Sequence, residues 1–346
     1  MPVPKDPRRY PGIMVETFGR ALRRLREQAG LSQPDLARRV PISQSSLSRY
    51  ESDRQQADPA TVDRLDQLLD ANGTLRALLT PVDAAARILN PGDHDRLTYV
   101  ANKPRSVDPA TLTSLTAVLA ESRRMEDQLG ARIMLEPALE YLRMLEVLTF
   151  DARGPIRAHV VDLAGQWAQF TGWLYAATDQ VSAAGRWFDR TVEWALESNN
   201  LALQANALTF KGNLAWMIGR IGTMIGLSQA AQRHQSIYIG QLAYATTQEA
   251  RGHAVAGDRA QAERQLDLAG ERADQIPAQI NNAPPWNYDS PALLALERGL
   301  VRQHLGHNQA AADLLTTGIV TLPAEQRDAE WTEDYRTALA EVQTKL

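Results

Sequence analysis

Two helix-start signals, separated by a proline, divide the segment from residue 18 to residue 51 into short helices. Ser32 can cap a helix by accepting a backbone N–H, and Pro34 suits the first turn, where no donor is needed. Pro41 cannot donate a hydrogen bond and disfavours helical geometry in the residue before it, whereas Ser43 can cap a new start. The sequence therefore predicts one helix from about residue 33 to residue 40 and a second from about residue 44 to residue 51.

The side chains of these two helices divide into an apolar set and a polar set. The apolar residues that could pack across a tight helix crossing are Leu36, Ala37, Ile42, Leu47 and Tyr50. The second helix otherwise carries small or polar residues that are left for solvent or a partner, namely Gln44, Ser45, Ser46, Ser48 and Arg49. Taken alone, this pattern fits an ordinary helical hairpin as well as a helix shaped to enter a DNA groove.

The flanking segments favour a larger helical domain. Upstream, Phe18, Leu22 and Leu25 have the spacing of one helix face. Downstream, Asp58 and Pro59 supply a cap and a first turn, and residues 74–79 begin a fifth helix. We therefore expect five short helices between residues 16 and 80.

This arrangement resembles the helix-turn-helix of the Xre family, which includes phage repressors of the lambda and Cro type. The family's most recognisable positions are L-S-Q at residues 31–33, L-A at 36–37 and S-x-x-S-x-L-S-R-x-E across the second helix. One departure is Pro41, where the family usually has glycine or another residue that tolerates a left-handed backbone. We therefore expect the turn between the two helices to be built differently here.

The resemblance implies binding to double-stranded DNA, with the second helix in the major groove. Gln44, Ser45 and Ser48 are the candidates for base edges, and Arg49 could read guanine or hold a phosphate. Gln33, at a helix N-terminus, is in the position that clamps a phosphate in this family. Weaker phosphate candidates, for which solvated surface charge is an equal alternative, are Arg38, Arg39 and Arg54.

Charge supports the same assignment. Residues 1–56 hold eleven basic and six acidic side chains, a net charge of +5, whereas the whole chain carries −4. A basic first sixth on an acidic body places the phosphate-facing surface at the N-terminus. Residues 1–15, with four prolines, are expected to form a flexible basic arm.

The remainder of the 346-residue chain is expected to be one large helical body. The chain has no cysteine, which fits a cytoplasmic protein, and neither a signal peptide nor an apolar run of membrane length is found. Basic residues that are nearly all arginine are typical of GC-rich bacterial genomes, such as those of actinobacteria. Residues 81–107 suggest a linker with a short structured piece, and residues 108–346 have almost uninterrupted helical patterns.

The body repeats a helix-turn-helix unit. Turns are predicted at Gly219, Gly257 and Gly306, with a looser case at Asp179. Small residues recur at fixed offsets on either side of the glycine turns, so that paired helices can approach closely. This spacing resembles the tetratricopeptide repeat and implies an α-solenoid, although the period is irregular. A less regular helical bundle is the alternative. The predicted fold is thus all-α, a five-helix lambda-repressor-like domain followed by a solenoid.

A solenoid of this kind presents a groove lined by the first helix of each pair. The repeat register selects the candidate ligand-binding residues Gln169, Asn206, Asn213, Trp216, Tyr244 and Arg251. An asparagine pair seven residues apart shares a helix face and could hold the backbone of an extended peptide. Regulators of this two-part type, which resemble the peptide-pheromone receptors of Gram-positive bacteria, use groove asparagines in this way. The alternative is that these amides are merely solvated or cap neighbouring turns.

The sequence thus predicts a transcriptional regulator that reads an operator as a homodimer and senses a peptide, small-molecule or protein effector. A protein-interaction scaffold with a DNA-locating head and an enzyme with a pocket in the body are the alternatives. No phosphate loop or nucleophile motif supports an enzyme, and no cofactor is expected. His304 and His307 have a spacing that could bind a metal, but nothing completes a ligand set, so no metal site is expected.

Overall fold

The computed structural model describes residues 18–52, 55, 57–71, 75, 88–276 and 290–346. The chain divides into two compact units, residues 1–82 and residues 83–346, and each is considered by itself. The predictions for the arm, for Arg54, for the helix at residues 74–79 and for the start of the linker fall largely or wholly outside the described residues. Within the described parts the chain is helical, without strands, which confirms the predicted all-α class.

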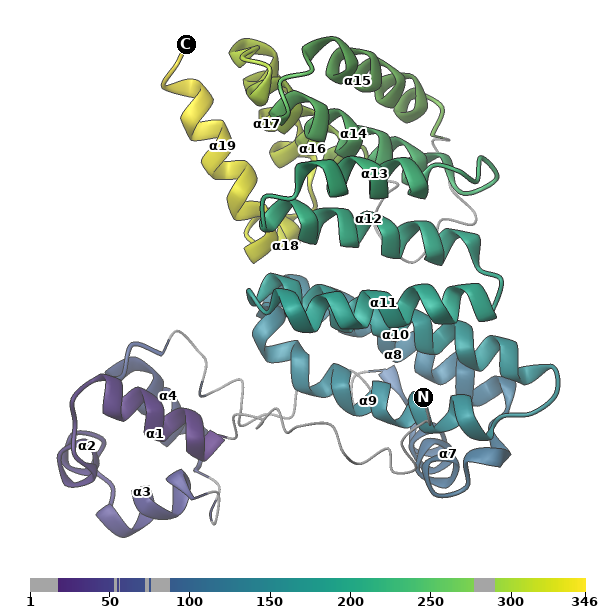
Figure 1. Ribbon diagram of the computed structural model, residues 1–346. Helices are drawn as coiled ribbons and strands as arrows, with labels where there is room; N and C mark the ends of the chain where they lie inside the picture. The colour runs from purple at the N-terminus through teal and green to yellow at the C-terminus, as the bar shows by residue number, and fades with distance from the viewer. Residues whose placement is uncertain (1–17, 53–54, 56, 72–74, 76–87, 277–289) are drawn as a thin grey trace. The chain divides into compact units, whose positions relative to one another are not determined.

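The N-terminal unit contains four described helices, which confirm the predicted pattern (Figure 1). Ser32, Ser43 and Asp58 each cap a helix by accepting a backbone N–H with the side chain, as predicted. Leu22 and Leu47 are fully buried in a single apolar core that joins all four helices. The helices are α1 (Phe18–Gln28), α2 (Gln33–Arg39), α3 (Gln44–Glu51) and α4 (Pro59–Leu68).

The turn between α2 and α3 has the positive φ that glycine usually provides, but its hydrogen bonds differ from those of a glycine turn, as Pro41 led us to expect. Pro41 has a φ of 21°, and the N–H of Ile42 bonds the carbonyl oxygen of Ala37 at 3.1 Å. A helix that ends at a glycine usually has two backbone hydrogen bonds across its end, and this bond, which spans five residues, is one of them. The second would be donated by the backbone N–H of residue 41, which proline lacks. Pro41 therefore leaves the turn with one of these two hydrogen bonds and with a strained backbone.

The second unit is a stack of antiparallel helix pairs followed by a final helix (Figure 1). Its helices are α7 (Pro91–Asn102), η1 (Pro104–Ser106), α8 (Pro109–Leu129), α9 (Ala131–Asp151), α10 (Ile156–Ala177), α11 (Val181–Glu197), α12 (Leu201–Met217), α13 (Ile221–Ala231), α14 (Ile239–Val255), α15 (Arg259–Asp274), α16 (Pro291–His304), α17 (Asn308–Thr321), α18 (Ala324–Arg327), η2 (Glu330–Thr332) and α19 (Glu333–Gln343). Helix α7 lies in the segment predicted as a linker, but it belongs to this unit. Its start is fixed by a capping box between Asn90 and Asp93.

The predicted turns between paired helices are confirmed. Gly219, Gly257 and Gly306 have φ values of 72°, 82° and 76°, and Asp179 takes 60° at the looser turn. The small residues predicted on either side of these turns also allow paired helices to approach closely. A Cβ on Gly299 of α16 would stand 2.7 Å from the Leu315 side chain of α17, so only glycine permits this approach.

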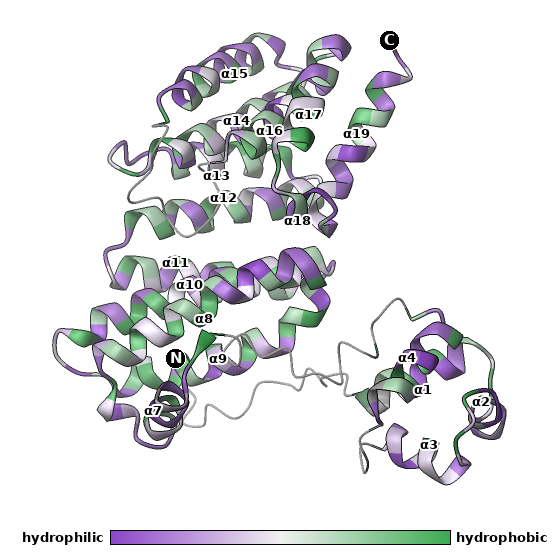
Figure 2. Cartoon of the chain, turned by 180° about the vertical axis from the view of Figure 1, so that it is seen from behind, coloured by the Kyte–Doolittle hydropathy of each residue, from purple (hydrophilic) through white to green (hydrophobic). Residues whose placement is uncertain are grey.

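The helices differ in how deeply they are buried. Fourteen residues of α10 are buried but only four of α15, which places α10 in the interior of the body and α15 at its surface. Figure 2 shows the corresponding contrast, with hydrophilic residues predominating along α15.

Hydrogen bonds join the beginning of the body to its end, and we call this contact the clasp. The Asp127 carboxylate of α8 accepts the Gln326 side-chain amide and the Trp331 indole N–H, both at 3.0 Å. The Glu330 carboxylate accepts the backbone N–H of Ala131 at 3.3 Å, at the start of α9. Since the joined residues are about 200 positions apart, the clasp closes the stack of helices into an arc.

A buried carboxyl group lies beside the clasp. Glu126 is 8% exposed, and burial, together with the negative charges of Asp127 and Glu330, raises its pKa to about 8. A hydrogen bond from Trp173 opposes this shift without cancelling it. The folded protein therefore holds this proton at pH values where the unfolded chain has released it.

We expect Glu126→Gln to stabilise the protein in a pH-dependent way. Because the pKa of Glu126 is raised on folding, its ionisation does not change the free energy of unfolding below pH 4.5. Between pH 4.5 and pH 8 ionisation lowers that free energy increasingly, and above pH 8 it lowers it by the full amount. Glutamine has the same shape and cannot ionise. Urea unfolding should show a gain of nearly 5 kcal/mol at pH 8.5, since the shift from 4.5 to about 8 is about 3.5 pKa units and one unit corresponds to about 1.4 kcal/mol. At pH 5 the gain should be less than about 1 kcal/mol. An equal gain at both pH values would contradict the assignment.

Candidate DNA-binding surface and ligand site

Helix α3 presents the predicted polar face to solvent. Gln44, Ser45, Ser48 and Arg49 are all exposed, whereas Leu47 on the opposite face is fully buried. This division follows from the helical period, since the residues that pack on α1 and α2 leave the others outward. A helix of this length with small outward side chains fits the width of a DNA major groove.

The predicted phosphate and guanine contacts differ in how they are held. The Arg49 guanidinium donates from Nε to the Ser45 carbonyl oxygen at 3.2 Å, which lays the side chain along its own helix. Arg38 forms a short ion pair with Asp35 of the same helix. Both arginines are exposed, so these local contacts can exchange for contacts with a nucleic acid at little cost.

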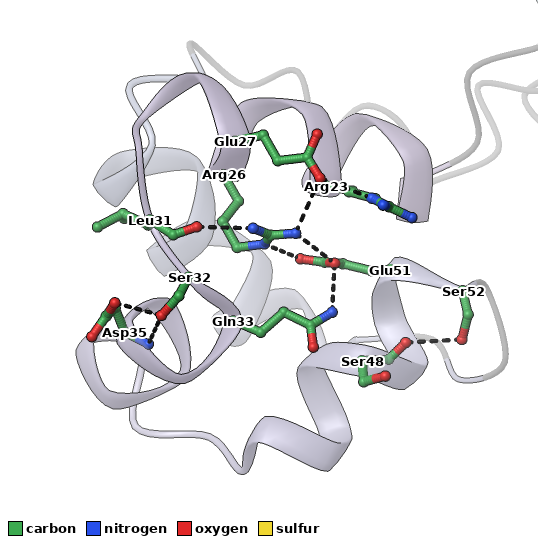
Figure 3. Close-up of polar contacts among 10 residues, drawn as sticks. All are labelled: Arg23, Arg26, Glu27, Leu31, Ser32, Gln33, Asp35, Ser48, Glu51 and Ser52. Carbon is green, nitrogen blue, oxygen red and sulfur yellow. Dashed lines mark hydrogen bonds and ion pairs between the residues drawn. The ribbon is translucent and has the colours of Figure 1, made fainter.

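Gln33 is held by a buried ion pair that the sequence did not reveal (Figure 3). The Gln33 amide donates from Nε2 to the Glu51 carboxylate at 2.8 Å. Glu51 in turn accepts two hydrogen bonds from Arg26, at 2.5 Å and 3.1 Å. An amide nitrogen carries two hydrogens, so Gln33 can donate one to Glu51 and the other to a phosphate.

The ion pair joins three helices at one point. Arg26 lies on α1 and is 8% exposed, and Glu51 ends α3 and is 9% exposed. Arg26 also donates to the Leu31 carbonyl oxygen at 2.8 Å, ahead of α2. The hydrogen bonds and charge of Glu51 raise the pKa of Arg26 despite the opposing effect of burial. The position of α3 therefore depends on this pair.

A close approach between α1 and α3 accompanies the ion pair. A Cβ on Gly19 would stand 2.5 Å from the Tyr50 carbonyl oxygen and 2.7 Å from the Glu51 backbone. Since backbone atoms cannot move aside as a flexible side chain can, any larger residue at this position would separate the two helices.

We expect Glu51→Gln to loosen the N-terminal unit, because it leaves the buried Arg26 guanidinium with only its longer contact to the exposed Glu27, at 3.5 Å. Removing one member of a buried ion pair costs about 3 kcal/mol or more. Hydrogen exchange of the full chain should therefore speed up by about 100-fold for the amides of α1 and α3. As a matched control, Arg23→Gln removes the exposed pair of Arg23 with Glu27 without altering a partner of Arg26, and it should leave exchange nearly unchanged. Equal effects of the two substitutions would contradict this role of Glu51.

In the second unit, the structure brings together four of the predicted ligand-binding residues. Asn213 and Trp216 lie on α12, and Tyr244 and Arg251 lie on α14. The Asn213 side-chain oxygen accepts a hydrogen bond from Arg251 at 3.0 Å, and its nitrogen is 3.4 Å from the Tyr244 hydroxyl. The Arg251 guanidinium lies over the Trp216 ring, 4.9 Å from its centroid. We call these four residues the α12–α14 cluster.

The two other predicted residues lie elsewhere. Asn206 has no exposed surface, so in this structure its amide is not presented to a ligand. Gln169 on α10 is 4% exposed, and its side-chain oxygen is 3.5 Å from Arg123 of α8. The predicted pairing of Asn206 with Asn213 on one accessible face is therefore not what the structure shows, because α12 is covered unevenly along its length.

Four residues of the two sites were not predicted from the sequence. Arg26 and Glu51 each follow a buried leucine by four positions, which places a charge on the core face of its helix. Glu297 on α16 and Tyr335 on α19 extend the α12–α14 cluster. A charged residue at a core-facing helical position is thus the signal that could have identified three of these four.

Comparisons with known proteins agree with the geometry of the N-terminal unit. Residues 17–79 match the family of helix-turn-helix domains. The N-terminal unit is therefore a helix-turn-helix domain, the class to which its capped helices α2 and α3 also point. No curated protein matches the chain.

Among solved structures, the chain is similar to PlcR of Bacillus thuringiensis in complex with the peptide PapR7 and DNA. The identity is 12%, the match covers 95% of this chain and 99% of the other, and the TM-score is 0.40. A likeness at this level supports no inference about the site.

None of the described helices combines the length and apolarity needed to cross a membrane. Within the same residues, no group of three or more histidine, aspartate or glutamate side chains is placed to hold a metal ion.

Proposed function

We propose that the protein is a transcriptional regulator that reads a specific operator through α3 and responds to an effector bound by its helical body. The observation that carries the first half is the exposed face of Gln44, Ser45, Ser48 and Arg49 on a helix fixed by a buried core. Bases are read by side chains of this type in the major groove, with glutamine suited to adenine and arginine to guanine.

Gln33 has a different role in this proposal. It begins α2, where backbone N–H groups favour an anion, and its amide is oriented by Glu51. A phosphate contact from this position fixes the domain on the duplex without selecting a sequence. Arg38 adds positive charge on the same helix, and Arg54 is proposed for the same purpose.

We expect base-reading and phosphate-binding residues to separate in a selection experiment. The full-length protein is used to enrich binding sites from a random DNA library. Gln44→Ala and Arg49→Ala should each relax the enriched motif at one position, by about 5-fold or more, because a bidentate base contact is worth about 1–3 kcal/mol. Gln33→Ala should weaken binding to all sequences alike and leave the motif unchanged.

The exposed body residue Arg264 supplies a matched control for charge. Arg264→Ala should change neither the motif nor the affinity. If the Gln44→Ala and Arg49→Ala proteins both enriched the wild-type motif at full strength, the docking of α3 in the groove would be wrong. Failure of the wild-type protein to enrich any motif would overturn the regulator proposal itself.

The operator is proposed to be read by a homodimer. One small domain makes few base contacts, and two half-sites about one helical turn apart multiply its specificity. An enriched motif that forms an inverted repeat, together with a dimeric mass in light scattering, would support this arrangement.

The effector is proposed to be a peptide held beside the α12–α14 cluster. Asn213 and Trp216 are partly exposed there, and an asparagine amide can pair with both the donor and the acceptor of a peptide bond. An aromatic ring next to such a group adds apolar contact, as in most ligand sites. A small molecule or a protein segment with the same groups is the other possibility that the experiment below would reveal.

We expect Asn213→Ala to remove effector binding and Asn206→Ala to spare it. The effector is first recovered with wild-type protein from its own host by native mass spectrometry. Asn213 is partly exposed within the cluster, whereas Asn206 on the same helix is fully buried and serves as the matched control. Asn206→Ala should lower the thermal unfolding midpoint while its folded fraction still carries the effector. Retention of the effector by Asn213→Ala would contradict this location.

A further inference from the structure

The guanidinium of Arg251 is buried but incompletely bonded. Arg251 is 7% exposed, and its Nε forms no hydrogen bond in the structure. A buried N–H without an acceptor costs free energy, and in arginine the charge increases that cost. The position therefore favours an incoming acceptor.

The unbonded group lies on a definite edge of the guanidinium. By covalent geometry, Nε–H and one hydrogen of Nη2 point in the same direction and form a fork that matches the two oxygens of a carboxylate. At present Nη2 donates to Asn213 alone, and Nε donates to nothing. This edge is thus half filled by a neutral amide oxygen.

The internal counter-charge of Arg251 does not occupy that fork. The Glu297 carboxylate lies 3.5 Å from Nη1, which is not part of the Nε–Nη2 edge. Glu297 also accepts a hydrogen bond from the Tyr335 hydroxyl at 2.6 Å, which holds it toward α19. A second carboxylate can therefore approach Arg251 without displacing Glu297.

The surroundings of the fork are reachable from solvent. Trp216, against which the guanidinium stacks, is partly exposed, and the residue His304, whose ring centroid is 5.6 Å from that of Trp216, has exposed surface. Its imidazole ring packs against neighbours, and this desolvation, together with the charge of Arg251, lowers the pKa of His304 and favours the neutral form.

We infer that the Nε–Nη2 edge of Arg251 binds a carboxylate of the effector, in place of the Asn213 oxygen. This inference rests on the proposed function, since it names the chemistry of the ligand at the α12–α14 cluster. Displacement is inexpensive for Asn213, because its oxygen also accepts a hydrogen bond from Gln248 at 2.6 Å and keeps that partner. Ligand binding would therefore change the hydrogen bonds of Asn213 on α12 and of Arg251 on α14.

The carboxylate could belong to the peptide C-terminus or to an acidic side chain, and three pools of random heptapeptides separate these sources. The first pool has free C-termini and no aspartate or glutamate. The second has amidated C-termini and one acidic residue, and the third has amidated C-termini and no acidic residue. The full-length protein is mixed with each pool, and retained peptides are measured by mass spectrometry after size exclusion.

The wild-type protein is expected to retain the first or the second pool about tenfold more than the third, because a bidentate charge-assisted contact is lost in the third. Arg251→Gln should abolish this preference while still retaining peptides through Asn213 and Trp216. Arg251→Lys should restore only part of it, since an ammonium lacks the fork.

Two controls keep the outcome interpretable. Arg251→Gln leaves Glu297 buried without its cation, so the double variant Arg251→Gln with Glu297→Gln is measured beside it and should show the same loss in a folded protein. Equal retention of all three pools by the wild type would overturn the carboxylate inference and leave the peptide proposal intact. Retention of no pool would overturn both.

Discussion

A charge that leaves water stays ionised in a folded protein only when an opposite charge and hydrogen-bond partners are buried with it. Both units of this protein are organised by that constraint. In the first, Arg26 and Glu51 fix α1 against α3 and orient Gln33. In the second, Arg251 and Glu297 lie between α14 and α16. The two pairs differ in how fully the arginine is bonded. Glu51 accepts two hydrogen bonds from Arg26, whereas the Nε of Arg251 has no acceptor.

The elements that the sequence predicted are those set by neighbouring residues. Caps at Ser32 and Ser43 and turns at Gly219 and Gly257 depend on a few consecutive side chains, and the structure has them where expected. The exposed face of α3 followed for the same reason, since helical periodicity alone separates Leu47 from Ser48. Pro41 shows the limit of local reasoning, because packing on either side holds it at a positive φ that its ring disfavours.

Features that depend on distant residues were not predictable in this way. From the sequence alone, Glu51 looks like an exposed charge at the end of a helix. In the structure it is buried against α1. Asn206 and Asn213 share a helix face by spacing, yet only Asn213 retains exposed surface, because neighbouring helices cover one end of α12 more than the other. Periodicity gives the direction in which a side chain points, but only tertiary packing decides what it meets there.

The clasp changes the mechanics of the body. In an open stack of helix pairs each pair touches only its neighbours, so the terminal pairs can fray singly and strain at one end fades along the chain. Here Asp127 and Glu330 bond the α8–α9 pair to α18 and η2, so these two distant parts of the stack support each other directly. A shift anywhere in the arc must then be accommodated all around it. The body should respond as one elastic loop, with opening of the clasp as its single costly event.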